Sequence, residues 1–493
     1  ALLMASMKTF YNTTSIPYVN ADPHIGHALE FAQADILARF ERSRGKDVFF
    51  LIGTDENALK NVQAAESAGV AVERWVNDRA EVFRQLASSL SISNDDFIRT
   101  ASEERHRKGA QKLWASCKNG DIYKKKYKGL YCVGCESFKT EKDLTKGECP
   151  EHPGKKLEAI EEENYFFKLS NYQNQLRDLI ESNRLKIIPE SRRNEILKFI
   201  KSGLEDFSIS RSRERARNWG IPVPGDENQI MYVWFDALSN YINALGYADN
   251  GEKFVKYWEK GDEIVHAIGK DINRFHTVYW PAMLISAGVR LPDSIFVHGF
   301  ITSEGQKMSK TLGNVVNPAP LIQKYGVDAV RHYLLREIPS YEDGDFSIKK
   351  FEERYNSDLA NGLGNFAARV LTLGEKISPI SLEEEKNIDS EILRQIGGAK
   401  INFEGALRER RFESAAQAVW SLISWGDGYV NEKKPWETND RKVIAGLVVL
   451  LRTIGYYLVV LLPSTAEKLL GRIVQEGDAI KIIKGEALFP RLN

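Results

Sequence analysis

The chain has 493 residues, enough for two to four domains, and its 43% hydrophobic and 28% charged content is that of a soluble globular enzyme. Lys plus Arg and Asp plus Glu both number 68, so net charge gives no argument for a nucleic-acid partner, and RNA contacts would need local patches. Four cysteines in so long a chain exclude a disulfide scaffold and favour a reducing compartment, and the sequence predicts no membrane span.

Strand and helix signals alternate over the first hundred residues. Residues 8–14 predict a strand, and a helix follows whose apolar residues have helical spacing, namely Ile25, Leu29, Ala32, Ile36 and Phe40. Gly45 indicates the end of that helix. The apolar run 47–53 is typical of a parallel strand buried on both faces. This strand–helix–strand unit predicts an α/β fold with a doubly wound parallel sheet.

The pattern changes after about residue 115. A stretch rich in Lys, Gly and Cys continues to about residue 160, and charged helical segments follow to residue 226, which predicts an insertion. Strand signals return at 262–271 and 294–302, with a helix between them. Because ligands in open α/β sheets bind beyond the carboxyl ends of strands, Gly53–Asp55 and Gly269–Asp271 are candidate site segments.

Strand signals stop at about residue 350, and amphipathic helical patterns continue to about residue 475. One apolar stripe comprises Tyr355, Leu359, Leu363, Phe366 and Val370. The pattern predicts a separate helical bundle followed by an extended tail. The predicted domains are 7–115, the first half of a Rossmann-like catalytic domain; 116–230, the insertion; 231–300, the second half; 301–350, a loop and linker; and 351–493, the bundle with its tail.

His24 and His27 flank Gly26 where the first helix begins. Backbone N–H groups and the helix dipole make such a junction an anion site, and Gly26 would let a bulky nucleotide approach closely. A structural role is the commoner one for an isolated histidine. A metal site would need further ligands, and this segment offers only Asp22 and Glu30.

A second candidate segment is the glycine-containing loop 304–314, with the sequence EGQKMSKTLGN. Lys307 and Lys310 stand either side of Ser309 and could bind a polyphosphate as mobile point charges. The alternative is an ordinary solvated basic loop. The same alternative applies to the basic runs near residues 124–128, 192–193 and 211–217.

Three of the four cysteines lie close together in the sequence of the insertion. Cys132 and Cys135 form one pair, and Cys149 and His152 form a second pair with the same spacing. Three thiolates and one imidazole complete a tetrahedral structural zinc site and leave no position for a substrate. A redox Cys-x-x-Cys is the alternative, but it would not need the second pair. Cys117 is left over as a bystander thiol.

Together, the His-Ile-Gly-His and Lys-Met-Ser-Lys segments resemble the signature pair of class I aminoacyl-tRNA synthetases, with Thr311 in place of the usual last Ser. The segments TTSIPYVNADPHIGHALE, GTDE, YVWFDALSNYI, AIGKDINRFHTVYWPAML and VHGFITSEGQKMSKT resemble the methionyl-tRNA synthetase family over nearly the whole chain. The resemblance implies a Rossmann-like sheet, a zinc-binding connective insertion and an all-α anticodon-binding domain.

The resemblance also implies a methionine pocket, formed by Ile16, Tyr18, Asp55, Trp234, Ala237, Leu238, Tyr241, His276 and Trp280. Asp55 can pair with the substrate ammonium group, and aromatic rings suit a polarizable thioether. Without the resemblance, Trp234 and Trp280 would be interpreted as core aromatics. The chain departs from the family beside the pocket, where Asn57 and Ala58 replace the frequent His-Gly.

For adenylation, the resemblance implies ATP contacts from His24, Gly26, His27, Gly269, Asp271, Lys307 and Lys310. His24, His27, Lys307 and Lys310 are the expected catalytic residues, with Lys310 the more important lysine at the pyrophosphate. Asp271 would accept from the ribose hydroxyls, and Gly269 would leave room for the nucleotide. Mg²⁺ would accompany ATP, and Arg211 matches a family arginine near the active site.

In the bundle, Asn365, Arg369 and Trp436 match positions that read the anticodon. The first two are spaced i, i+4 and share a helix face, and a tryptophan can stack on an unstacked base. The alternative for all three is an ordinary surface or core role. The expected partners are L-methionine, ATP and tRNA(Met), including initiator tRNA, for a cytoplasmic monomer.

Other functions remain as alternatives. Synthetases for leucine, isoleucine or valine carry a large editing domain, for which the insertion is too small. A synthetase for cysteine would be expected to place its zinc ligands at the substrate pocket, whereas these cysteines lie in the insertion. A nucleotidyltransferase with His-x-Gly-His would lack the zinc insertion and the bundle. A non-catalytic tRNA-binding relative would not need His24, His27, Lys307 and Lys310.

Overall fold

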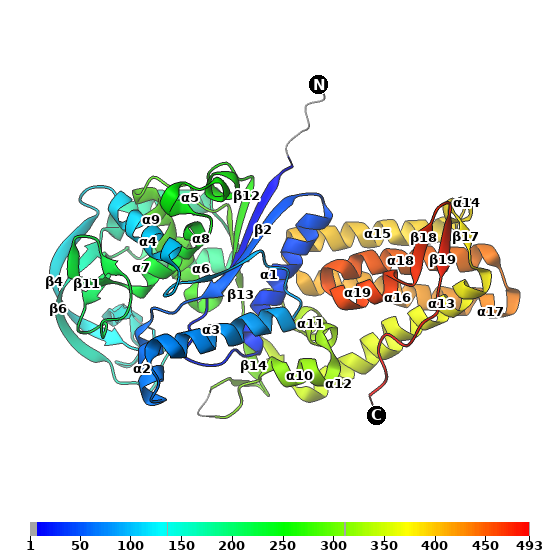
Figure 1. Cartoon of the computed structure of the whole chain (residues 1–493), viewed down its shortest axis with the longest axis horizontal. Coiled ribbons are helices and arrows are strands. Elements are labelled where there is room, and N and C mark those ends of the chain that lie inside the picture. Colours follow the sequence, from blue (N-terminus) through cyan, green and yellow to red (C-terminus); the bar gives the residue numbers. More distant parts are fainter. Residues whose placement is uncertain (1–6, 136, 310–311, 493) are drawn as a thin grey trace, which may run out of the picture. The chain divides into compact units, whose positions relative to one another are not determined.

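The computed structural model describes residues 7–135, 137–309 and 312–492 (Figure 1). The chain divides into two compact units. The first unit comprises Ala1–Pro23, Arg44–Gln85 and Ser93–Val297, and the second comprises His24–Ser43, Leu86–Ile92 and His298–Asn493.

A six-stranded sheet organises the first unit. Its strands, in spatial order, are β3 (Asp96–Arg99), β2 (Asp47–Thr54), β1 (Thr9–Thr14), β12 (Glu263–Gly269), β13 (Ser294–His298) and β7 (Lys186–Ile188). β1 pairs in parallel with β2 and β12, β2 with β3, and β13 with β7. Every residue of β1 is buried. The predicted parallel sheet is confirmed, and its order reverses beside β1, the kind of position where open α/β sheets bind ligands.

Helices connect these strands. Those that matter for the site are α2 (Leu59–Ser67), α3 (Val72–Ser89), α4 (Glu104–Ser116), α7 (Val233–Leu238), α8 (Asn240–Asn243) and α9 (Trp280–Ser286). A single π-helical turn, η6 (Phe275–Tyr279), runs directly into α9. The predicted helix between the strands at 262–271 and 294–302 is therefore present, with its first turn widened.

The insertion in the first unit is built on a long antiparallel pair, β4 (Ile122–Cys132) and β6 (Glu158–Phe167), seen in cyan and green in Figure 1. Lys126 lies opposite Glu163, and Lys128 lies opposite Glu161. Since acidic residues face the basic ones, this run fits a solvated charged face better than an RNA-binding patch. Helix α5 (Gln173–Glu181) then precedes β7 in the chain, and helix α6 (Glu190–Lys201) follows it.

The prediction of a single strand at 294–302 is wrong, because this segment forms two strands that lie in different sheets. β13 ends at His298, and β14 (Ile301–Ser303) joins β15 (Gln306–Lys307) and β16 (Gly344–Phe346). A Cβ on Gly299 would lie 2.3 Å from the carbonyl oxygen of Glu342. Glycine therefore permits a close backbone approach where the chain changes sheet.

The second unit contains the helix α1 (Ile25–Ser43), the helices α10 (Pro318–Tyr325) and α11 (Val327–Arg336), and a helical bundle. The main bundle helices are α13 (Asn365–Ile377), α15 (Ser390–Arg408), α16 (Phe412–Lys433) and α18 (Arg441–Leu461), which pack alongside one another (Figure 1). All five residues of the predicted apolar stripe are buried. The predicted bundle is confirmed.

Two features of the bundle go beyond the sequence-based prediction. Three short strands form a small sheet after residue 350, namely β17 (Ile380–Ser381), β18 (Ile473–Glu476) and β19 (Ala479–Ile482). Helix α18 is also long and apolar enough to cross a membrane, but 61% of its most apolar window is buried inside the structure. That burial is typical of a central bundle helix. The tail packs back on the bundle, with the Phe489 ring 6.0 Å from that of Tyr355.

Candidate active site and metal cluster

The carboxyl ends of three neighbouring strands carry the first group of predicted site residues. Ile16 follows β1, Asp55 follows β2, and Gly269 ends β12. The Asp55 N–H donates to the carbonyl of Pro17 at 2.8 Å, and Tyr18 forms a parallel bridge with Asp55. These contacts fix the Asp55 backbone beside that of Tyr18, and Asp55 is only 2% exposed.

Aromatic rings pack beside these strand ends. Trp234 stacks on Phe275 with ring centroids 3.8 Å apart and nearly parallel planes, and it meets Tyr18 edge-on at 6.3 Å. Ala237 and Leu238 follow Trp234 in α7, and both are 2% exposed. The structure therefore brings these predicted pocket residues together. Phe275 was missed, although it directly precedes His276 in the sequence.

Hydrogen bonds fix the tautomers of two buried histidines in this aromatic group. His276 Nδ1 lies 3.0 Å from the carbonyl of Ile272, which can only accept, so Nδ1 carries the proton. Its Nε2 therefore accepts from the Tyr241 hydroxyl at 2.7 Å. The Tyr241–His276 hydrogen bond thus has a defined direction and lies among aromatic rings. The ring centroids of Tyr241 and Trp280 are 6.1 Å apart.

His266, on β12, is a second residue that the sequence analysis missed. Its Nε2 accepts from Trp280 Nε1 at 3.3 Å, and its Nδ1 lies 2.7 Å from the Thr13 hydroxyl. Burial lowers the pKa of His266 well below its ordinary value, with His276 contributing. A neutral His266 therefore holds Trp280 in place. Its only sequence signal is a histidine inside an apolar strand.

Asp271 stands apart from this buried group because its side chain is exposed. It lies in a single 3₁₀ turn, Lys270–Ile272, which begins directly after β12. The buried Gly269 precedes it at the end of the strand. An exposed carboxylate at the carboxyl end of a central strand is well placed to accept hydrogen bonds from ligand hydroxyls.

In the second unit, the rings of His24 and His27 lie close together at the start of α1, with their planes tilted by 37°. Their ring centroids are 4.0 Å apart. His24 Nδ1 accepts from the Gly26 N–H, and His27 Nδ1 accepts from the His24 N–H, both at 3.0 Å. Each neutral ring therefore carries its proton on Nε2. His24 acts as an N-cap, and Gly26 leaves room for its ring.

The pKa values of both histidines favour the neutral form. Burial lowers the pKa of His24 to about 4. Burial also lowers the pKa of His27 well below its ordinary value, with smaller effects of His24 and His298. Two neutral Nε2–H donors at a helix N-terminus can bind an oxyanion by hydrogen bonds and by the helix dipole.

The lysine-containing loop is held next to this helix start within the second unit. The Ile25 N–H donates to the carbonyl of Val316 at 2.9 Å. Asn314 shapes the loop, since its Oδ1 accepts from the Ser309 N–H at 2.8 Å and its Nδ2 donates to the Lys307 carbonyl at 3.2 Å. The Lys307 side chain is exposed. Lys310 and Thr311 lie outside the described residues.

The predicted metal ligands converge in the insertion. The ligand atoms of Cys132, Cys135, Cys149 and His152 all lie within 4.8 Å of one another. His152 Nδ1 is 3.3 Å from Cys135 Sγ and 3.8 Å from Cys132 Sγ. Zinc–sulfur bonds of about 2.3 Å in a tetrahedron would place ligands about 3.8 Å apart. The donor set and its spacing fit zinc.

Two other predicted residues have different surroundings. Arg211 lies in β9 (Ser210–Ser212), with its guanidinium 4.8 Å from the Tyr131 ring centroid and 4.9 Å from that of Tyr232. Its position is therefore beside the strand that carries Cys132. Cys117 is outside the metal cluster, and burial raises the pKa of its thiol to about 12.

The predicted anticodon residues share one surface of the bundle. Arg369 lies in α13 one turn after Asn365, whose side chain is exposed, and its guanidinium is 5.5 Å from the ring of Trp436. The Trp436 residue is 44% exposed. Two residues of α16 that the sequence analysis missed, Asp427 and Asn431, accept from Arg369 at 2.6 and 2.7 Å.

Comparison with known proteins agrees with this arrangement. The profile of the family "tRNA synthetases class I (M)" matches residues 10–159 and 152–371. The chain is 42% identical to the methionine–tRNA ligase of Brucella suis over 489 residues, which cover 96% of this chain and 93% of that protein. It is also 42% identical to that of Caldanaerobacter subterraneus, covering 99% and 79%.

A solved structure is similar as well. The methionyl-tRNA synthetase of Mycobacterium tuberculosis, in complex with methionyl-adenylate, superposes with a TM-score of 0.90 at 37% identity, covering 98% of this chain and 100% of that chain. These matches decide between the alternatives left open by the sequence, which included other class I synthetases and a small nucleotidyltransferase. The chain belongs to the methionine–tRNA ligase family of class I aminoacyl-tRNA synthetases.

Proposed function

We propose that this chain activates L-methionine with ATP to form methionyl-adenylate and then transfers the methionyl group to tRNA(Met). The observation that carries the proposal is the aromatic group around Trp234, Tyr241 and Trp280 beside the buried Asp55. Those rings suit a thioether, and a carboxylate suits the substrate ammonium group. Ile16, Tyr18, Ala237, Leu238 and His276 complete the proposed methionine pocket.

In the first step, a methionine carboxylate oxygen attacks the α-phosphorus of ATP, and pyrophosphate leaves. Such a reaction needs positioning and charge stabilisation rather than a protein nucleophile. The Nε2–H groups of His24 and His27 are assigned to the phosphate oxygens, with Gly26 allowing close approach. Lys307 and Lys310 are assigned to the leaving pyrophosphate, and Asp271 and Gly269 to the ribose and base side of the nucleotide.

In the second step, a terminal ribose hydroxyl of tRNA attacks the carbonyl carbon of the adenylate, and AMP leaves. Asn365, Arg369 and Trp436 are assigned to the anticodon, since an exposed tryptophan beside a guanidinium offers a stacking surface. The tRNA substrate includes the initiator tRNA, and the chain acts as a cytoplasmic monomer. Arg211 is proposed as a further residue near the active site.

Two metals belong to the proposal. Zinc held by Cys132, Cys135, Cys149 and His152 has a structural role, because four protein ligands fill its coordination sphere. Mg²⁺ bound with ATP supplies positive charge to the phosphates. The remaining chemistry falls to the side chains named above.

The test is methionine-dependent exchange of pyrophosphate into ATP by the purified chain. We expect exchange with methionine, and we expect Lys310→Ala to slow it severely while methionine binding is retained. Exchange that depends on another amino acid and not on methionine would contradict the proposed substrate. Wild-type exchange by Lys310→Ala would contradict the pyrophosphate role.

A further inference from the structure

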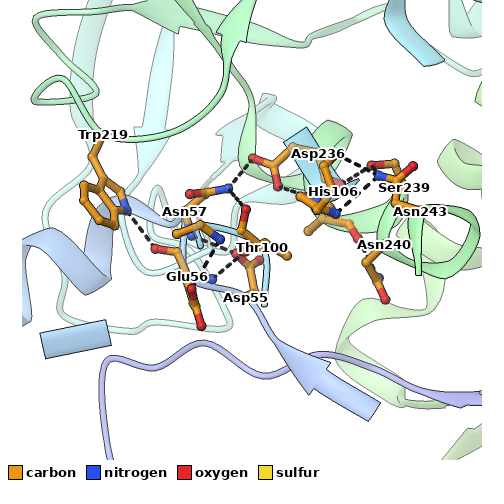
Figure 2. A network of polar contacts seen from close by, with 12 residues as sticks. Asp55, Glu56, Asn57, Thr100, His106, Trp219, Asp236, Ser239, Asn240 and Asn243 are labelled. Atoms are coloured by element: carbon orange, nitrogen blue, oxygen red, sulfur yellow. Dashed lines mark hydrogen bonds and ion pairs between the residues drawn. The ribbon is translucent and has the colours of Figure 1, made fainter. Parts of the chain in front are cut away.

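A buried polar network in the first unit joins three segments of the chain (Figure 2). Asn57 comes from the loop after β2, His106 from α4, and Asp236 from α7. His106 and Asp236 are completely buried, and Asn57 is 9% exposed. The first and third segments also carry proposed methionine contacts, so the network connects two walls of one pocket without being part of it.

Asp236 is the centre of the network. Its Oδ2 accepts from Asn57 Nδ2 at 3.3 Å, and its Oδ1 lies 3.4 Å from His106 Nε2. A buried carboxyl group that loses such a partner is destabilised, because no water replaces the lost hydrogen bond. Each of these two contacts therefore restrains α7, the helix that holds Trp234, Ala237 and Leu238.

Asn243 fixes the direction of the His106 contact. Its Nδ2 donates to His106 Nδ1 at 3.3 Å and to the His106 carbonyl at 3.2 Å. With Nδ1 accepting, the ring proton lies on Nε2 and faces Asp236. A Cβ on Gly109 would lie 1.9 Å from Asn243 Oδ1, so glycine at this position of α4 is needed for Asn243 to reach the ring.

Asn57 extends the network to the substrate side. Its backbone N–H donates to Asp55 Oδ1 at 3.2 Å, and its Nδ2 also donates to the Thr100 carbonyl at 3.3 Å. One residue thus orients the Asp55 carboxylate and bonds to the helix opposite. An amide does not titrate, so its donors persist at every pH.

We propose that Asn57, Asp236 and His106 are positioning residues for methionine recognition, which hold the Asp55 carboxylate at a fixed distance from the aromatic wall on α7. The inference rests on the proposed function, because it concerns the same pocket. The three side chains act through Asp55 and Trp234 rather than by contact with methionine. Their loss should therefore weaken methionine binding more than ATP binding.

The experiment measures KM for methionine and for ATP by pyrophosphate exchange in a swap series. Asn57→Asp replaces the amide donor with a second carboxyl group beside Asp236, and Asp236→Asn places two amide groups there. Each is expected to raise the methionine KM about tenfold or more, while the ATP KM stays within about twofold. The double variant restores one donor and one acceptor and should recover part of the loss. Asp249→Asn, an exposed site outside the network, is the matched control.

Several outcomes overturn the inference. It is wrong if the folded single variants keep the wild-type methionine KM, or if the ATP and methionine KM values rise together. It is also wrong if the double variant is no better than the single ones. If Asn57→Asp does not fold, Asn57→Ser replaces it in the series, because it removes the side-chain amide and keeps the backbone N–H. This variant should raise the methionine KM about threefold. An unchanged methionine KM contradicts the network. Absence of methionine-dependent exchange in the wild type contradicts the proposed function instead.

Discussion

Replacing Gly26 with alanine tests how the His24 ring is held at the start of α1. A Cβ at this position would lie 2.8 Å from His24 Cε1 and 3.0 Å from Nδ1, whereas ordinary contact begins at 3.4 Å. The ring must therefore move by about 0.6 Å, since it is the freer of the two groups. The hydrogen bond from the Gly26 N–H to His24 Nδ1 is lost or stretched.

The effects on stability nearly cancel. Alanine in place of glycine favours the helix by up to about 1 kcal/mol. Loss of the N-cap hydrogen bond costs about 1 kcal/mol. The melting temperature should therefore change by only a few degrees. Catalysis should suffer more, because a displacement of about 1 Å costs about 100-fold in rate. We expect the methionine-dependent exchange rate to fall about tenfold.

The assay is pyrophosphate exchange at saturating methionine, together with thermal unfolding of the same preparations. Gly397→Ala is a matched control, because its Cβ in α15 would meet nothing within 4 Å. That variant should gain up to about 1 kcal/mol of stability and keep its exchange rate. A Gly26→Ala protein that exchanges at the wild-type rate would refute the role assigned to the His24 ring.

Two further predictions concern the zinc cluster and the histidine pair. Cys149→Ser should lose close to one equivalent of zinc by metal analysis, while Cys117→Ser, outside the cluster, should keep it; zinc retained in both would contradict the ligand set. The pKa of His24 is about 4 in the folded protein and about 6.5 in the unfolded chain. Folding therefore gains about 3 kcal/mol from keeping His24 neutral. This stability is fully present above pH 6.5 and is lost as the pH falls toward 4. His24→Asn keeps an N-cap acceptor that does not titrate. Between pH 6.5 and pH 4, the free energy of unfolding of this variant should therefore fall by about 3 kcal/mol less than that of the wild type. Equal decreases in the two proteins would contradict a buried neutral His24.

Patterns local in sequence predicted much of the fold. A continuous apolar run predicted the buried strand β2, strand signals predicted β1 and β12, and helical periodicity predicted the bundle. The paired spacing of Cys132, Cys135, Cys149 and His152 predicted their convergence, because short turns bring such pairs together. The break at Gly299 was missed, since only the distant backbone of Glu342 shows why a side chain does not fit there.

The candidate site was predictable only where a motif names its residues. His266 and Phe275 escaped because their roles come from partners on other segments, namely Trp280 and Trp234. Asn314 escaped because its role is to bond the backbone of its own loop, which depends on the folded loop geometry. Lysines of β4 likewise lie opposite glutamates of β6 only because of the register of the two strands, and composition does not specify register. Side-chain partners across the fold are the information that a single sequence lacks.

Charging of tRNA tests the central claim most directly. The purified chain should attach methionine to a tRNA with the anticodon CAU and should lose most of this activity when one anticodon base is changed. Trp436→Ala should reduce charging of the CAU tRNA while methionine-dependent pyrophosphate exchange stays at the wild-type rate. Charging that ignores the anticodon, or attachment of another amino acid in place of methionine, would contradict the account.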